Sequence, residues 1–123
     1  MTPESNWDKL LAAKFLLADG ATGTNLFSKG LTTGDAPELW NIENTRKIGE
    51  LHTDFLEAGS QIILTNSFGG SICRLKLHKA EKRVTEINFA AAEIAKECAD
   101  KFQETKIVAG SIGPTGELFE PLG

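Results

Sequence analysis

Three short loops carry the residue types in this sequence that are best suited to bind a small polar ligand. Asp19 and Gly20 open the first loop, Asn66 and Ser67 lie in the second, and Gly110 opens the third. A carboxylate can bind an amino group, neighbouring backbone N–H groups can bind a carboxylate, and amide and hydroxyl groups can both donate and accept hydrogen bonds. These five residues could therefore contact a small polar ligand.

Each loop also has an interpretation that involves no ligand. Asp19 can accept hydrogen bonds from its own tight turn, and Asn and Ser are common turn residues. The glycine-rich segment 110–116 lets a ligand approach the backbone closely, or it forms a set of turns. It is not a phosphate-binding motif, because it matches neither Gly-x-x-x-x-Gly-Lys-Ser/Thr nor Gly-x-Gly-x-x-Gly. Residue types alone leave both interpretations open.

The elements that position these loops follow an alternating pattern. Short apolar runs at 15–18, 61–65 and 106–109 predict buried strands, and the second run suits a parallel strand buried on both faces. Apolar residues at spacings of three and four predict helices over 44–59 and 84–102. Alternating strands and helices favour an α/β fold with parallel strands, whose carboxyl ends meet at one edge of the sheet. The three loops should therefore lie together.

The connections carry weaker signals. We expect a short helix over 10–13, and a long irregular connection over 26–42 in which a helical turn could form. Asn44 or Thr45 should cap the helix that follows, and Gly59 should end it. A polar helical stretch should precede the last helix.

Composition limits the classes of partner. The 123 residues carry a formal net charge of -4, with 41% apolar and 24% charged residues, which is ordinary for a globular protein. An acidic balance offers no attraction to nucleic acid or to anionic lipids. No apolar run approaches the roughly 20 residues of a membrane helix, and no signal peptide is evident, so we expect a cytoplasmic protein.

The residues that commonly bind metals are not arranged as a site. His52 falls in a helical stripe and should be a packed histidine, while His78 has no metal-binding neighbour. Cys73 and Cys98 are too far apart for a paired-cysteine zinc site, and two cysteines suggest no disulfide framework. We expect Cys98 to be a small core residue, and Trp40 to anchor the long connection.

The end of the chain leaves the last predicted strand without a covering helix. An uncovered apolar strand is a liability, so we expect a truncated domain over 10–123, preceded by an N-terminal tail over 1–9. Two other interpretations stay open. One is an α/β module that binds a phosphorylated ligand, and the other is a non-catalytic half-barrel that dimerises.

The loops together resemble the homocysteine-binding barrel shared by cobalamin-dependent methionine synthases and betaine–homocysteine methyltransferases. The matching segments are 15–24, 51–60, 62–69, 108–116 and 121–123. The resemblance covers the chain from about residue 10 onward and implies a (β/α)₈ TIM barrel of about 250 residues. This chain would supply about the first three βα units of that barrel.

The resemblance also implies a reaction, in which a methyl group moves to the zinc-activated thiol of homocysteine to form methionine. Asp19 and Gly20 would hold the amino-acid end of homocysteine, Asn66 and Ser67 would line the site near the metal, and Gly110 would keep its floor open. The three cysteines that bind zinc in the family lie later in the barrel and have no match here. The chain alone should therefore be inactive. Methylcobalamin, betaine, S-methylmethionine and S-adenosylmethionine all remain possible methyl donors.

Overall fold

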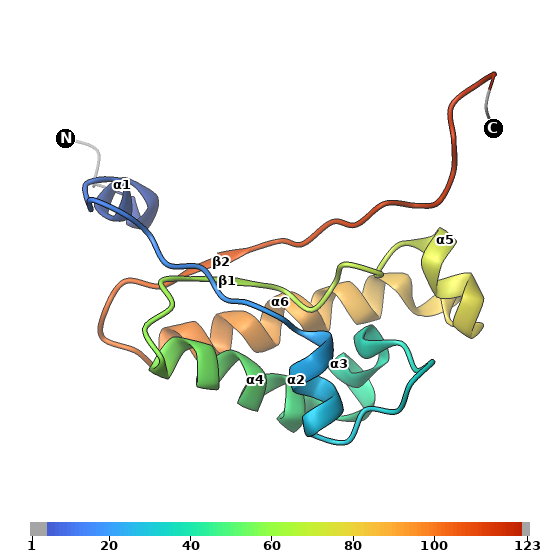
Figure 1. Ribbon diagram of the computed structural model, residues 1–123, viewed down its shortest axis with the longest axis horizontal. Coiled ribbons are helices and arrows are strands. Elements are labelled where there is room, and N and C mark those ends of the chain that lie inside the picture. Colours follow the sequence, from blue (N-terminus) through green and yellow to red (C-terminus); the bar gives the residue numbers. More distant parts are fainter. Residues whose placement is uncertain (1–4, 122–123) are drawn as a thin grey trace.

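Helices alternate with short parallel strands in the computed structural model, which describes residues 5–121 (Figure 1). β1 (Ile62–Leu64) and β2 (Ile107–Ala109) form a parallel pair. One further parallel bridge joins Ala18 to Ile62, on the other side of β1 from β2. The chain is therefore α/β, as predicted, and the eight-stranded barrel stays a prediction.

The remaining elements are helical. They are α1 (Asn6–Leu11), α2 (Gly23–Ser28), η1 (Pro37–Leu39), α3 (Trp40–Glu43), α4 (Thr45–Glu57), α5 (Ile72–Leu75), η2 (Lys76–His78), η3 (Glu81–Arg83) and α6 (Val84–Asp100). The two long helices, α4 and α6, lie on the same side of the strands (Figure 1). They occupy the two predicted helical segments, and α5, η2 and η3 form the predicted polar helical stretch.

The C-terminal end of α4 confirms the role predicted for Gly59. Its φ of 113° lies in the left-handed region that favours glycine. The Gly59 N–H donates to Leu56 O, and the Ser60 N–H donates to Phe55 O, which is the Schellman arrangement. The N-terminal end differs from the prediction, because neither Asn44 nor Thr45 caps the helix with its side chain. The Thr45 hydroxyl instead donates to the Asn41 carbonyl.

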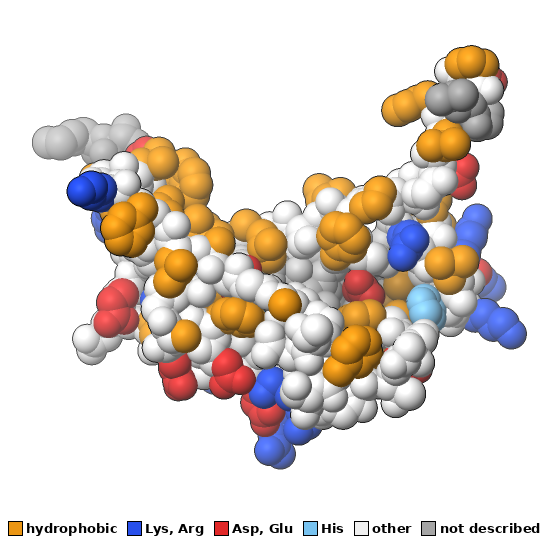
Figure 2. Space-filling model, viewed as in Figure 1, with side chains coloured by type: hydrophobic (Ala, Val, Ile, Leu, Met, Phe, Trp, Pro, Cys, Tyr) orange, Lys and Arg blue, Asp and Glu red, His pale blue; other side chains and the backbone are white. Residues whose placement is uncertain are grey.

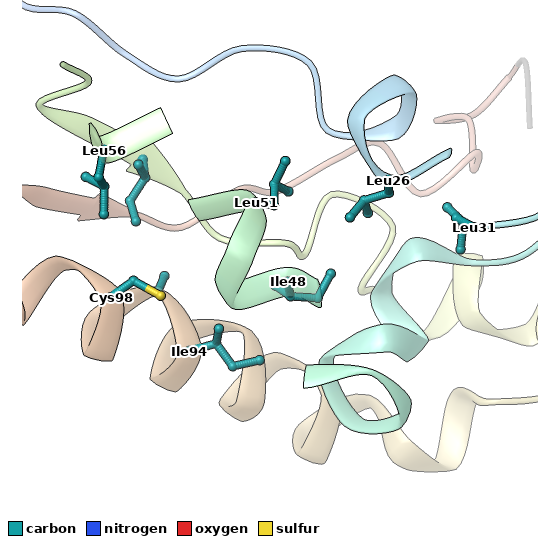
Figure 3. Close-up of a cluster of buried hydrophobic side chains, with 9 residues drawn as sticks. Leu26, Leu31, Ile48, Leu51, Leu56, Ile94 and Cys98 are labelled. Atoms are coloured by element: carbon teal, nitrogen blue, oxygen red, sulfur yellow. The ribbon is translucent and has the colours of Figure 1, made fainter. Parts of the chain in front are cut away.

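The core lies between the helices and the strands (Figure 3). Its buried residues are Leu26, Leu31, Ile48, Leu51, Leu56, Ile63, Ile94, Ala95 and Cys98. Complete burial of one such leucine or isoleucine contributes about 1.5–3 kcal/mol. Trp40 packs against this cluster and Cys98 belongs to it, so both behave as predicted.

The first predicted strand, over 15–18, is wrong as a strand. Only Ala18 pairs with β1, and Phe15 and Leu17 are 78% and 50% exposed. The segment is nevertheless extended alongside β1, because the Leu17 carbonyl accepts from the N–H groups of both Gln61 and Ile62. A single bridge is too short to form a ladder.

The N-terminal region is also more ordered than predicted. The helix predicted over 10–13 begins earlier, at Asn6, because Ser5 and Asp8 form a reciprocal capping box. Residues 6–9 of the predicted tail are thus helical, and residues 1–4 lie outside the described part. Within the connection over 26–42, the chain forms the end of α2, η1 and the start of α3, so it contains more helix than the predicted turn.

The face of the strands away from α4 and α6 leaves apolar side chains exposed. β1 is not buried on both faces as predicted, since Ile63 is buried but Leu64 is 45% exposed. Figure 2 shows hydrophobic side chains along the hollowed side of the molecule between the two chain ends. No helix within residues 5–121 is long and apolar enough to cross a membrane.

Candidate functional site

The three predicted loops meet at one edge of the sheet, and hydrogen bonds join them. The Asp19 carboxylate accepts from the Leu64 N–H at 3.0 Å, which links the first loop to β1. The Ser67 hydroxyl donates to the Ser111 carbonyl at 2.8 Å, and the Gly113 N–H donates to the Phe68 carbonyl at 3.1 Å. Parallel pairing brings the loops that follow the carboxyl ends of the strands together, as expected.

A chain of hydroxyl groups joins the second loop to the third. The Ser111 N–H donates to Thr65 Oγ1 at 3.0 Å, and Thr65 Oγ1 lies 2.6 Å from Ser67 Oγ. Because Ser67 gives its only hydroxyl proton to the Ser111 carbonyl, the Thr65 hydroxyl must be the donor in the 2.6 Å contact. The network therefore has one direction, and Ser67 Oγ keeps a second lone pair with which it can accept.

Asp19 carries the most unusual electrostatics of the predicted site residues. Its backbone N–H donates to Ile62 O at 2.9 Å, which holds the residue against β1. Carboxylate oxygen Oδ2 accepts from Leu64, whereas Oδ1 is buried and has no partner among the described residues. Burial raises the pKa of the carboxyl above its usual value, and the N–H groups of Leu64 and of Asp19 itself oppose the shift. Oδ1 therefore keeps unused acceptor capacity at a buried position.

Two buried carboxamides fix the backbone of the second loop. Asn41 is 1% exposed, and its Nδ2 donates to Asn66 O at 2.8 Å and to Ile87 O at 3.2 Å. Asn66 Nδ2 donates in return to Asn41 Oδ1 and to Pro37 O, both at 2.9 Å. Both amide protons of Asn66 are therefore used within the protein, and only its Oδ1 can still serve a ligand.

A buried acidic residue contacts the same loop. Glu38 is 7% exposed, and its Oε1 accepts from the Gly69 N–H at 2.7 Å. A Cβ added at Gly69 would lie 2.7 Å from that oxygen, so the carboxylate approaches as closely as it does because residue 69 is a glycine. The acidic group belongs to η1, which lies within the segment 26–42 that was predicted to be an irregular connection.

A cavity of about 310 Å³ opens at this edge. It is lined by Thr22, Gly23, Pro37, Glu38, Leu64, Thr65, Asn66, Ser67, Phe68 and Ser111. Of the five predicted binding residues, Asn66 and Ser67 line it; Asp19 and Gly20 do not, although Asp19 contacts the lining residue Leu64. Gly110 does not line it, and an added Cβ there would meet no atom within 4 Å, so no close approach explains that glycine.

Sequence reasoning missed Glu38 and Asn41, and it selected neither Thr65 nor Ser111 as a binding residue. Thr65 and Ser111 adjoin predicted residues, and their position at the ends of strands was a usable signal. Pro37 followed by an acidic residue is typical of the first turn of a helix, and it could have marked η1. No spacing signal pointed to Asn41, because its partners lie 25 and 46 residues away.

The described residues do not fit a metal ion. Within 5–121, no three His, Cys, Asp or Glu side chains are arranged to hold one. The Cys98 thiol is buried in the core, 3.5 Å from the Gly49 carbonyl, and Cys73 lies on α5. His52 is buried as predicted, and His78 is exposed.

Comparisons with known proteins agree on one family. A family model described as homocysteine S-methyltransferase matches residues 16–122. The chain is 27% identical over 118 residues to the methionine synthase of Mycobacterium tuberculosis, covering 89% of this chain and 10% of that protein. It is 29% identical over 112 residues to the homocysteine S-methyltransferase of Escherichia coli, covering 82% of this chain and 36% of that protein.

A solved structure shows the same relation. The metallated form of the homocysteine methyltransferase MmuM from Escherichia coli superposes on 91% of this chain with a TM-score of 0.77 and 28% identity. The match covers 42% of the MmuM chain. The present chain therefore spans less than half the length of each of these relatives.

Proposed function

The chain belongs to the homocysteine S-methyltransferase family, and on that premise we propose that its loops form part of a homocysteine pocket. The enzyme containing it would transfer a methyl group to the homocysteine thiol and form methionine. The observation that carries this proposal is Asp19, whose unpartnered carboxylate oxygen lies at the edge where the three loops meet. The chain alone would bind part of the substrate and would not catalyse the transfer.

Asp19 would bind the amino group of homocysteine through Oδ1. The Leu64 N–H holds Oδ2, so the carboxylate keeps its orientation whether or not a ligand is bound. The backbone N–H of Gly20 would receive the carboxylate end of the substrate. Charge-assisted hydrogen bonds of this kind contribute about 1.5–3 kcal/mol each. Their role is positioning, which turns a bimolecular encounter into a reaction between oriented groups.

The second and third loops would form the adjoining wall. Ser67 Oγ and Asn66 Oδ1 both keep acceptor capacity after their internal hydrogen bonds are counted. Thr65 and Ser111 hold Ser67 in place, so we propose that the hydroxyl network acts mainly by keeping the wall rigid. Gly110 stays a predicted member of the floor.

Zinc and cobalamin stay proposals for an enzyme that contains this chain. The described residues do not fit a zinc ion, because neither cysteine is placed to share one with another ligand. We therefore derive no step through a metal, and we leave the methyl donor open. A thiolate-binding metal, when present, would favour the deprotonated form of the homocysteine sulfur, which the transfer requires.

A phosphorylated ligand is the weaker alternative. The only charged side chain that lines the 310 Å³ cavity among the described residues is the acidic Glu38. A phosphoryl group there would face a carboxylate without any lysine or arginine to offset the repulsion.

Titration of the ¹⁵N-labelled chain with reduced L-homocysteine tests the proposal. We expect saturable shifts in the amides of Asp19, Gly20, Ser67 and Ser111, and affinity about tenfold weaker in Asp19→Asn. Asp100→Asn is the matched control, because that exposed carboxylate pairs with Lys96 and should leave the affinity unchanged. Shifts with inorganic phosphate but none with homocysteine would favour the alternative.

A further inference from the structure

Glu38 is a buried acidic side chain with one hydrogen-bond partner among the described residues. It lies in η1, where Pro37 begins the helical turn, and it is 7% exposed. Glutamates are almost never this buried unless their charge is paired. The sequence gives no reason to bury it, since an exposed glutamate would serve the first turn of a helix equally well.

Its partners inside the protein are few. Oε1 accepts from the Gly69 N–H, and no lysine, arginine or histidine within the described residues lies within 4.0 Å of the carboxylate. One neutral N–H offsets only part of the cost of removing a carboxylate from water. The remaining negative charge is therefore available to a cation.

Two cavities flank this carboxylate. Glu38 lines the 310 Å³ cavity at the loop junction, in which it is the only charged residue, and a second cavity of about 300 Å³ that Arg74 and His78 also line. Neither Arg74 nor His78 lies within ion-pair distance of the carboxylate, and both side chains are exposed to solvent. The first cavity contains no basic group, so a positively charged ligand group would meet no repulsion there.

We infer that Glu38 binds the ammonium group of an amino-acid ligand in the first cavity and so determines specificity for amino acids. The inference rests on the proposed function in taking homocysteine as that ligand. An ammonium group has three N–H donors, so binding to Glu38 would leave others for neighbouring acceptors. Gly69 makes the arrangement possible, because a Cβ there would displace the carboxylate.

The test compares two ligands that differ only in the amino group. Homocysteine and 4-sulfanylbutanoate, which lacks it, are titrated into the wild-type chain and into Glu38→Gln. Glutamine keeps the shape of the side chain and an oxygen that can accept from the Gly69 N–H, but it removes the charge. We expect wild-type chain to prefer homocysteine at least tenfold, and Glu38→Gln to lose most of that preference with unchanged affinity for 4-sulfanylbutanoate.

A purely structural role gives a different pattern. If Glu38 only holds the loop through Gly69, Glu38→Gln will weaken both ligands equally or neither, and the inference is overturned. Asp19→Asn is the matched comparison: loss of the preference in that variant alone would assign the ammonium group to Asp19 and exclude Glu38.

A second probe separates this inference from the proposed function. Ethylammonium chloride is titrated while the Gly69 amide resonance is followed, with sodium chloride as the ionic control. A shift in the wild-type chain that Glu38→Gln abolishes supports the cation site even if homocysteine does not bind, in which case the proposed function fails alone. Homocysteine binding with no ethylammonium response and no Glu38 dependence leaves the proposed function standing and refutes the inference.

Discussion

His52 should make the fold lose stability in mild acid. The side chain lies on α4, is 1% exposed, and has no hydrogen-bond partner for either ring nitrogen among the described residues. Burial lowers its pKa from 6.5 to about 4, because the charged imidazolium would lose its hydration there. The unfolded chain has no such constraint and binds the proton near pH 6.5.

The sign and size of the effect follow from these two values. Between pH 6.5 and 4 the unfolded state binds the proton and the folded state does not, so stability present above pH 6.5 is lost as pH falls. A difference of about 2.5 pKa units corresponds to about 3 kcal/mol by pH 4. Domains of this kind are stable by about 5–15 kcal/mol, so the loss is a large share of the total.

Urea denaturation of the wild-type chain and of His52→Leu, each measured at pH 7 and pH 4, tests this reasoning. Leucine is apolar and removes both unpartnered nitrogens, so it should stabilise the fold by about 1–3 kcal/mol at pH 7. Its advantage should grow by about 3 kcal/mol at pH 4. Other titrating groups occur in both proteins and cancel in the difference.

His78→Gln is the control, because it removes a histidine that the fold leaves exposed. Equal pH dependence in His52→Leu and the wild type would refute the argument. It would mean that the imidazole is hydrated or hydrogen-bonded in solution.

Four further predictions concern the site. In an enzyme that contains this chain, Asp19→Ala should raise the KM for homocysteine while zinc content holds, and steady-state kinetics with metal analysis would expose an unchanged KM. Burial raises the pKa of Asp19, so its contribution to stability is present below the unfolded pKa and is lost as pH rises. In urea melts, the free energy of unfolding of Asp19→Asn should therefore rise relative to that of the wild type between pH 3 and pH 7. Asn41→Ala should lower the free energy of unfolding by about 3 kcal/mol, because it leaves groups of Asn66 and Ile87 buried without partners. A decrease below about 1 kcal/mol in urea melts would contradict the importance of these hydrogen bonds. Gly113→Ala should displace the third loop, since its Cβ would overlap the Phe68 carbonyl oxygen, and an unchanged Phe68 environment by NMR would count against this contact.

The long helices could be predicted because one physical signal determined each of them. Ile48, Leu51 and Leu56 recur at helical spacing and are all buried in α4. Gly59 ended that helix through its positive φ, which few other residues adopt without strain. Burial of a helical stripe and the conformational freedom of glycine are local properties, so they can be recognised without knowing the partners.

The first strand failed because strand formation depends on a neighbour. The run at 15–18 is as apolar as a buried strand, yet Phe15 is 78% exposed and only Ala18 pairs. A strand needs a ladder on at least one side for several residues, and β1 offers the segment a single bridge. Sequence pattern reports the preference of a segment, whereas pairing depends on what lies beside it.

The same distinction separates the predicted site residues from the missed ones. Asn66 and Ser67 could be predicted because they directly follow a strand, and parallel strands bring such residues to one edge. Glu38 and Asn41 reach that edge from a segment outside the strand pattern, through contacts with residues 25 to 46 positions away. A local pattern can therefore find the residues that face the cavity from the sheet, but not those that close it from the side. If Glu38 binds the ligand's ammonium group, the residue that selects the ligand is among those that only the folded chain brings into view.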